Sequence, residues 1–439
     1  MHTSRTTPLT VIGGGLAGLV SAVTAAESGT PVHLHEAHHT LGGRARTAPG
    51  PYRTNEGPHA LYSRGPLWTW LQQRDLVGPA ARVPLRAAAL TRFHRDGVLR
   101  RMPPLPVIRL GRKQAGDAPV DSDFHTWAAS LIGERQARHA AHSIGVAVFH
   151  HDPGALSARF VQERLHRVLA MPPEAKYPLG GWGSVVDRLA THARSLGVRI
   201  ETDARFTGSD LADAAARGPV IVATSLAAAR HLLGDDSLAW ESGRTALLDL
   251  GLRTRRGDAF IVSDLDAPGW IERFTAQDPT LAPAGEQLVQ AQLPLAPNES
   301  RPVGIARAER LLDLGFPGWR ERVTHRSEAL ATGRTGALDL PGTTWRDRPA
   351  IDRGNGIHLA GDQVAAPGLL AEVSLNSALE ATSLALRNAR LRRLKAADRA
   401  VGRSGGRAVA RSRGRAVGRS RGRAVGRSRQ VTPGDARTP

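Results

Sequence analysis

The hydrophobic positions at the start of the chain follow the order strand, turn, helix, strand. Residues 9–12 are a short apolar run, which is typical of a strand buried on both faces of a parallel sheet. After a glycine-rich turn, residues 16–28 predict a helix that ends before Gly29, and apolar and polar side chains alternate over residues 31–36 as in a second strand. This order predicts a β-α-β unit, the building block of a parallel sheet.

The same kinds of pattern return in the middle and at the end of the chain. Residues 198–202, 220–223 and 357–360 are further short strands, and residues 184–196 and 368–393 predict helices. The pattern elsewhere predicts helices over residues 124–149, 156–169, 225–233, 306–314 and 319–326, and strands over residues 90–94, 98–101, 245–252, 259–262 and 287–292. We therefore expect an α/β protein in which a Rossmann-like parallel sheet is interleaved with a domain of mixed α+β structure.

This interleaving divides the chain into two discontinuous domains and a tail. The dinucleotide-binding domain is expected over residues 1–66, 178–240 and 346–394. The substrate domain is expected over residues 67–177 and 241–345. Residues 395–439 form the tail, in which blocks of eight resemble RAVGRSRG. Such a repeat of Gly, Ser and Arg cannot build a core, so we expect the tail to be disordered.

The positive charge of the chain is concentrated in this tail. The formal net charge is +19, but residues 399–439 hold 12 arginines and one acid, and residues 387–398 add +4, which leaves only +4 for residues 1–386. Spaced arginines favour at most a weak, non-specific anionic partner, such as a membrane surface to which the protein would be peripheral. Without aromatic residues to stack on bases, we expect no stable nucleic-acid complex. A solvated repeat without function is the favoured interpretation.

The absence of cysteine removes several kinds of chemistry. Disulfides, thiolate metal sites, a cysteine nucleophile and a thioether-linked cofactor are excluded. The composition is compatible with the cytoplasm, which is where we expect the protein. His33, His35, His38 and His39 have the density of a metal site, but they lie in the predicted nucleotide domain without a matching set of carboxylates, so no metal is expected.

Three spaced glycines form the turn after the first strand. In Gly13-x-Gly15-x-x-Gly18 the first glycine permits a tight turn, the second lets the backbone approach a pyrophosphate, and the third allows close packing of helix and strand. The helix N-terminus attracts phosphate through its unpaired N–H groups and its dipole. Glu36 ends the second strand, where an acid accepts hydrogen bonds from ribose hydroxyls. The residues predicted to bind the dinucleotide here are Gly13, Gly14, Gly15, Leu16, Ala17, Gly18, Glu36 and Ala37.

A second glycine element bears on whether the dinucleotide is FAD or NAD. Gly42-Gly43-Arg44 follows shortly after the acid, so that backbone N–H groups and a guanidinium can meet the pyrophosphate. Through this element the chain resembles the superfamily of FAD-dependent amine oxidases, protoporphyrinogen oxidases and phytoene desaturases, whose second FAD motif is a GG-R element after the acid. The resemblance implies that the cofactor is FAD and that Gly42, Gly43 and Arg44 bind it.

Two segments in the first half of the chain resemble the same superfamily. Residues 55–62, NEGPHALY, resemble its segment that passes near the flavin. Residues 178–183, PLGGWG, followed by residues 197–206, resemble the unit that returns to the adenine, and Phe206 falls at that position. The resemblance implies that Phe206 contacts the adenine.

A third segment, in the last quarter of the chain, resembles the C-terminal FAD motif of the superfamily. It consists of residues 359–362, LAGD, followed by Pro367-Gly368 and a predicted helix. The resemblance implies that Gly361 and Asp362 lie at the ribityl and pyrophosphate groups. It also implies that Leu370, at the helix start, lies near the flavin C2 carbonyl, where the helix dipole favours the anionic reduced flavin.

The resemblance covers about residues 9–386 and is nearest to the phytoene-desaturase-related branch. The chain departs from that branch in two ways, because the segment between Phe206 and Val220 is short and lacks the usual hairpin, and because the chain before the tail is short for a carotenoid desaturase. Amine oxidases of this superfamily often use a lysine near the flavin. Of the three lysines, only Lys176 is a candidate, and it matches no motif, which counts against ordinary amine oxidation.

The expected chemistry is transfer of a hydride from an organic substrate to the flavin N5. The resemblance puts the segment of His59 and Tyr62 near the ring, so both are candidate catalytic residues and His59 is also expected to contact the flavin. A base or water would take any proton. We expect a dehydrogenase or oxidase of a small apolar or cyclic molecule. A flavin-dependent amine oxidase and a non-catalytic FAD-binding protein of the same fold are the alternatives, and the sequence leaves the oligomeric state open.

Overall fold

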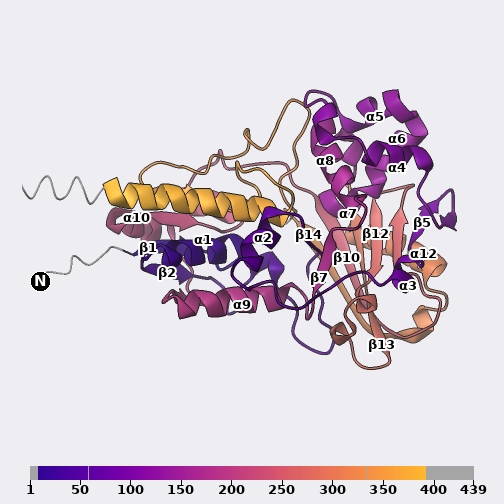
Figure 1. Cartoon of the computed structure of the whole chain (residues 1–439), viewed down its shortest axis with the longest axis horizontal. Coiled ribbons are helices and arrows are strands. Elements are labelled where there is room, and N and C mark those ends of the chain that lie inside the picture. Colours follow the sequence, from indigo (N-terminus) through magenta and orange to yellow (C-terminus); the bar gives the residue numbers. More distant parts are fainter. Residues whose placement is uncertain (1–7, 58, 334, 392–439) are drawn as a thin grey trace, which may run out of the picture. The chain divides into compact units, whose positions relative to one another are not determined.

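The chain builds two main sheets that differ in how their strands pair. A computed structural model describes residues 8–57, 59–333 and 335–391 (Figure 1). The described residues up to Asn388 belong to one compact unit. The expected disorder of residues 395–439 concerns a segment outside the described residues.

The first sheet has five parallel strands, as the sequence predicts. They are β1 (Leu9–Ile12), β2 (Val32–His35), β8 (Arg199–Glu201), β9 (Val220–Val222) and β15 (Ile357–Leu359). Their order is β15-β9-β1-β2-β8, so strands from the end, the middle and the start of the chain lie side by side. All five come from the segments expected to form the dinucleotide domain, and the predicted Rossmann-like α/β architecture is confirmed.

Helices on this sheet bury the first hydrophobic core, and Figure 1 shows α1, α9 and α10 beside its strands. They are α1 (Leu16–Glu27), α2 (Pro66–Gln72), α9 (Trp182–Ser195), α10 (Gly208–Arg217), α11 (Leu226–Leu233) and a final helix over residues 371–391. Helix α10 lies in the short segment before Val220, where the pattern predicted no element. Its signal is a capping box in which Thr207 and Asp210 bond each other's backbone N–H groups, a device that contributes about 1 kcal/mol.

The second sheet has seven strands and mixed pairing. They are β5 (Arg92–Arg95), β6 (Val98–Arg100), β10 (Arg244–Arg253), β11 (Ile261–Asp264), β12 (Gly269–Arg273), β13 (Glu286–Pro294) and β14 (Val323–Thr332). The order is β14-β10-β13-β12-β11-β5-β6, and only β5 and β11 pair in parallel. Helix α12 (Arg301–Gly315) covers one face, where Leu248, Val289 and Leu312 share an apolar core.

One predicted helix is a strand instead. The pattern predicted a helix over residues 319–326, but a short 3-10 turn over Arg320–Arg322 leads directly into β14. Strand β14 lies at the edge of the sheet, and most of its side chains are exposed. Its hydrophobic pattern therefore carries little information about its conformation, which is decided by antiparallel pairing along the whole of β10.

A group of helices with its own hydrophobic core lies beside the second sheet in Figure 1. It contains α4 (Leu105–Gly111), α5 (Phe124–Ile132), α6 (Glu134–Ser143), α7 (Gly145–Val148) and α8 (Ala158–Val168). The single helix predicted over residues 124–149 is wrong. Gly133 adopts φ +81° and ψ +154°, a conformation outside the helical region that glycine tolerates, and it separates α5 from α6.

The remaining α-helix and strands of the described residues are short. They are α3 (Leu85–Ala88) and the strands β3 (Leu61–Tyr62), β4 (Ala80–Ala81) and β7 (Ala175–Pro178), of which β7 pairs with both of the others. Within the described part of the chain, no helix combines the length and the apolar character needed to cross a membrane.

Candidate functional site

The glycine turn after β1 is held by close backbone contacts. Gly13 has φ +107°, and a Cβ at that position would lie 2.6 Å from the carbonyl oxygen of Ala223, the residue directly after the neighbouring strand β9. A Cβ at Gly18 would lie 1.9 Å from the Gly13 carbonyl oxygen. Only glycine at both positions lets α1 begin directly on top of the turn, which brings the helix N-terminus to the carboxyl end of the sheet.

The second and first glycine elements lie against each other. The Gly42 N–H donates to the Gly14 carbonyl oxygen at 2.8 Å, and Gly15 and Gly42 form an isolated parallel bridge. Gly15 is the N-cap of α1, and no side chain caps this end of the helix. The first turn, which contains Leu16 and Ala17, has no acidic residue. The positive end of the α1 dipole is therefore free of side-chain caps beside a second glycine turn, an arrangement suited to a pyrophosphate.

Glu36 joins this turn to the end of β2. Its buried carboxylate accepts from the Gly14 N–H at 2.7 Å through Oε2. Its Oε1 accepts from the backbone N–H of His38 at 2.9 Å and lies 2.8 Å from the His38 Nδ1. The His38 side chain is 61% exposed. A ribose hydroxyl would therefore replace an exposed imidazole at Oε1, while Oε2 continues to hold the turn. Ala37 lies beside it, partly buried.

The third predicted motif meets the second through an ion pair. Arg44 donates to the carboxylate of Asp362, although 318 residues separate them in the sequence. The preceding residue, Gly361, is tied to the final helix, because its N–H donates to the Ser377 hydroxyl at 2.9 Å and its carbonyl oxygen accepts from that hydroxyl. The second glycine element is thus bonded to the first through Gly42 and to the C-terminal element through Arg44.

The start of the final helix is held by charged residues that sequence reasoning missed. The helix begins at residue 371, after Leu370 with φ +53°, and not at residue 368. The carboxylate of Glu372 accepts from the Leu369 N–H at 3.1 Å and from Arg167 at 2.8 Å. Arg167 also donates to Glu174 at 2.6 Å and lies 5.1 Å from the centre of the Tyr62 ring. No sequence motif marks Arg167, since its partners come from distant segments.

Phe206 lies at the Glu36 end of the sheet. Its ring is 4.8 Å from the His35 ring, and the backbone N–H of Ala204 donates to the Glu36 carbonyl oxygen at 2.8 Å. Phe206 also lines a small surface hollow of about 250 Å³ next to α10. This place agrees with the predicted adenine contact, which stays a prediction.

Of the two candidate catalytic residues, His59 is fully buried and Tyr62 is partly buried. His59 is 1% exposed, stacks on Phe274 with ring centres 4.1 Å apart, and places its Nε2 2.5 Å from the Gln290 Oε1. Burial lowers the pKa of His59 to about 4, so the imidazole is neutral at pH 7. Burial raises the pKa of Tyr62 to about 12. Both groups therefore keep a fixed protonation state at neutral pH, and their catalytic role stays a prediction.

A third buried titratable group, Glu272, was not predicted. It is 3% exposed and accepts from the Trp270 Nε1 at 3.1 Å and the Gln277 Nε2 at 2.8 Å. Burial raises the pKa of Glu272 from 4.5 to about 7. Asp249 lies on β10 of the same sheet, and burial raises its pKa to about 6. Both carboxyl groups lie opposite Gln290 in the sheet, and Gln290 in turn lies within hydrogen-bond distance of His59.

The raised pKa of Glu272 makes stability depend on pH. Between pH 4.5 and about 7 the folded protein keeps a proton that the unfolded chain has released, so the stability that this group provides is lost as the pH rises. The shift corresponds to about 3 kcal/mol. In urea unfolding across this range, we expect Glu272→Gln to lose less stability than the wild type as pH rises. Because Asp249 and His59 titrate in both proteins, the difference isolates Glu272, and equal slopes would contradict the prediction.

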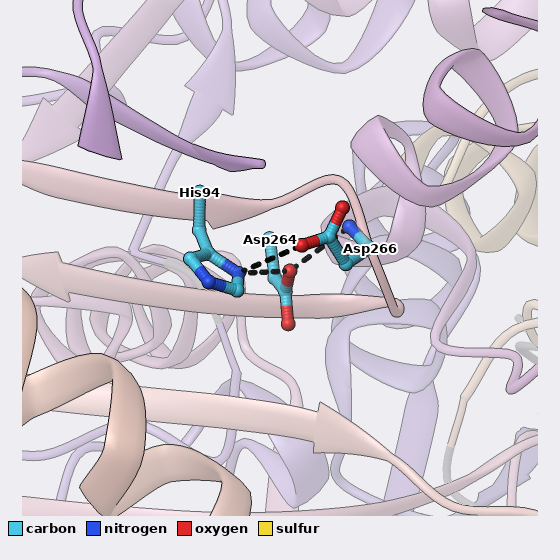
Figure 2. Close-up of side chains that lie close together, drawn as sticks. All are labelled: His94, Asp264 and Asp266. Carbon is cyan, nitrogen blue, oxygen red and sulfur yellow. Dashed lines mark hydrogen bonds and ion pairs between the residues drawn. The ribbon is translucent and has the colours of Figure 1, made fainter. Parts of the chain in front are cut away.

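One group among the described residues has the spacing of a metal site. Figure 2 shows His94 facing the carboxylates of Asp264 and Asp266, with its Nδ1 2.8 Å and 3.7 Å from their oxygens. The same oxygens accept backbone N–H groups, from Asp266 at 3.0 Å and from Asp96 at 2.8 Å. His94 and Asp264 are also register partners on parallel strands. Cross-strand pairing and a tight turn account for this cluster.

Comparisons with known proteins give the same fold. The family described as NAD(P)-binding Rossmann-like domain matches residues 11–74. An oxidoreductase from Methanosarcina mazei has 18% sequence identity and a TM-score of 0.66, over 86% of this chain and 100% of its own. Cyclohexylamine oxidase from Brevibacterium oxydans IH-35A has 15% identity and a TM-score of 0.62, over 87% and 99%. Reduced UDP-galactopyranose mutase has 13% identity and a TM-score of 0.61, over 86% and 92%. No curated protein matches the sequence significantly.

These similarities extend along nearly the whole of the matched chains. They confirm, at the level of the fold, the resemblance that the sequence motifs indicate. A Rossmann-like dinucleotide-binding unit at the start of the chain is likewise confirmed.

Proposed function

We propose that this protein binds FAD and is a flavin-dependent oxidoreductase that takes a hydride from a small organic substrate. The observation that carries the proposal is the meeting of three distant motifs: the Gly42 N–H bonds the Gly14 carbonyl oxygen, and Arg44 pairs with Asp362. A lone glycine turn suits many ligands, but two glycine turns and a paired acid along one path suit the length of a dinucleotide.

FAD is favoured over NAD by the parts of the site outside the first β-α-β unit. The first β-α-β unit, which runs from β1 to Glu36 directly after β2, contains the elements that both cofactors use. The second glycine turn at Gly42-Gly43 and the C-terminal element at Gly361-Asp362 extend the path beyond that unit. The fit is supported by the uncapped N-terminus of α1 beside this path.

Several residues have defined roles in this proposal. The N-terminus of α1 and Arg44 would hold the pyrophosphate, and Glu36 would accept from the ribose. Bound FAD would supply the two-electron acceptor for the hydride. Arg167 and Glu372 position the start of the final helix, and the neutral His59 positions Gln290 on the adjacent sheet. None of these buried groups needs to change its protonation state for a hydride to leave the substrate.

The fold leaves the type of reaction open, because one fold supports different chemistries. A dehydrogenase or oxidase related to phytoene desaturases is our first candidate, acting on a small apolar or cyclic molecule. Amine oxidation is the second, since cyclohexylamine oxidase shares the fold and two carboxyl groups, the partly buried Asp249 and the buried Glu272, lie on the adjacent sheet. A protein that binds FAD without turnover is the remaining alternative.

The test is the visible spectrum of the purified full-length protein, followed by anaerobic addition of candidate donors. We expect a yellow protein whose flavin band bleaches with at least one donor. A protein that stays colourless after incubation with FAD would refute the cofactor. A yellow protein that dithionite bleaches but no organic donor reduces would favour the non-catalytic alternative, and peroxide formed with amines in air would select amine oxidation.

A further inference from the structure

The face of the second sheet opposite α12 carries a row of buried polar side chains. Asp249 on β10 lies directly opposite Gln290 on β13, and Gln290 lies directly opposite Glu272 on β12. Leu248 and Val289, which precede Asp249 and Gln290 on their strands, belong to the apolar core under α12. Because successive side chains of a strand point to opposite faces, the row lies on the other face of the sheet. Three neighbouring strands thus present hydrogen-bonding groups where a core would present apolar ones.

The directions of the hydrogen bonds follow from the side chains. Both N–H donors of Gln290 are used, because its Nε2 donates to Asp249 at 2.6 Å and to the Asn55 carbonyl oxygen at 3.1 Å. Its Oε1 must then accept from the Nε2–H of His59. In the neutral imidazole the other nitrogen, Nδ1, is consequently an acceptor. Gln277 and Trp270 similarly donate to Glu272.

This network leaves an excess of buried acceptors. Within the described residues, the His59 Nδ1, the Gln277 Oε1 and the Gln292 Oε1 have no hydrogen-bond partner. All three side chains are more than nine-tenths buried, and Gln292 lies two residues from Gln290 on the same face. The Asn55 Nδ2 is the unpartnered donor of the group. An unpaired buried polar atom costs about 1–3 kcal/mol, so these acceptors indicate a ligand that donates hydrogen bonds.

The charge of this face points the same way. In the part of the chain that the structure describes, neither Asp249 nor Glu272 forms an ion pair with an arginine or lysine, and burial is the main cause of the raised pKa of each. Asp249 and the Trp270 ring remain partly accessible. A bound cation would let both carboxyl groups ionise, and the indole face would attract it further.

We propose that this face of the sheet, defined by Asp249, Glu272, His59, Gln277 and Gln292, binds a small organic cation with several N–H donors, an amidinium or ammonium group. It forms the anchoring subsite for the charged group of the substrate, which deepens the proposed function and rests on it. The reacting carbon need not carry the nitrogen. This substrate class differs from the apolar molecule expected from the sequence, because the row exists only through strand pairing.

Benzamidine, an amidinium cation, and benzamide, its neutral isostere, are the probes. Titrated by calorimetry into the full-length protein as purified, benzamidine should bind at least about tenfold more tightly than benzamide, as expected for one charge-assisted hydrogen bond. Glu272→Gln and Asp249→Asn keep size and shape but remove the charge, and each should weaken benzamidine binding by about tenfold or more. Glu328→Gln, on the α12 face of the same sheet and partly exposed, is the matched control and should bind as the wild type does.

The outcomes separate this inference from the proposed function, because each sample's flavin content is read from its absorbance. Equal binding of both probes, no binding, or an equal loss in Glu328→Gln would overturn the subsite, even in a yellow protein. Charge-dependent binding to a protein that stays colourless after incubation with FAD would support the subsite and refute the cofactor. If Glu272→Gln fails to fold by circular dichroism, Asp249→Asn decides, and unchanged affinity in that variant overturns the proposal.

Discussion

Replacing Gly18 with alanine will produce a protein that binds the dinucleotide about a hundredfold more weakly and unfolds at a lower temperature. The added Cβ would lie 1.9 Å from the Gly13 carbonyl oxygen and 3.0 Å from its carbon, so α1 must move away from the glycine turn. Overpacking of this kind costs about 1–3 kcal/mol, and the upper end corresponds to about a hundredfold in affinity. The Gly14–Glu36 bond depends on the same turn and would be displaced with it.

The sign of this effect is diagnostic. Alanine in a helix interior is normally about 1 kcal/mol more favourable than glycine, so a site without a close contact would gain stability. The measurements are the thermal midpoint and the flavin retained per protein after gel filtration. Gly116→Ala is the control, because a Cβ at Gly116 meets nothing within 4 Å. Wild-type flavin content in Gly18→Ala would show that the turn does not bind the cofactor as proposed.

Replacing Arg167 with methionine will destabilise the protein by about 3–5 kcal/mol, the cost of leaving buried charges unpaired. Arg167 bonds Glu174 and Glu372 at 2.6 Å and 2.8 Å, and these carboxylates are 7% and 8% exposed. Arg64, 3.8 Å from Glu174, compensates only one of them. Because Glu372 also caps the start of the final helix, we expect the variant to lose flavin affinity together with stability.

Urea unfolding measures this prediction, and a compensated variant tests its cause. Adding Glu174→Gln and Glu372→Gln to Arg167→Met removes the stranded charges and should recover most of the lost stability. Arg230→Met is the control, since Arg230 pairs with the exposed Asp236 and should cost less than about 1 kcal/mol. If Arg167→Met were as harmless as the control, the cluster would be a surface ion pair and not a structural support of the helix start.

Much of the candidate site could be predicted because its requirements are local. The spacing of Gly13 and Gly18 reflects one tight turn and one close approach, and Glu36 stands at the end of the next strand. These features depend on residues within a single β-α-β unit, whose order is visible in the hydrophobic pattern. The sequence prediction was wrong where the pattern is weak, as in exposed β14, or interrupted, as at Gly133 between α5 and α6.

The sequence by itself determined the parallel sheet, the glycine turns and the class of ligand that they suit, since glycine spacing and apolar periodicity act over a few residues. Only the tertiary structure decided that Arg44 meets Asp362, that Arg167 holds the final helix, and that Asp249, Gln290 and Glu272 align across three strands. The physical reason is that strand register and side-chain contacts depend on packing between distant segments. A periodicity reports that a residue is buried, but not which group it faces.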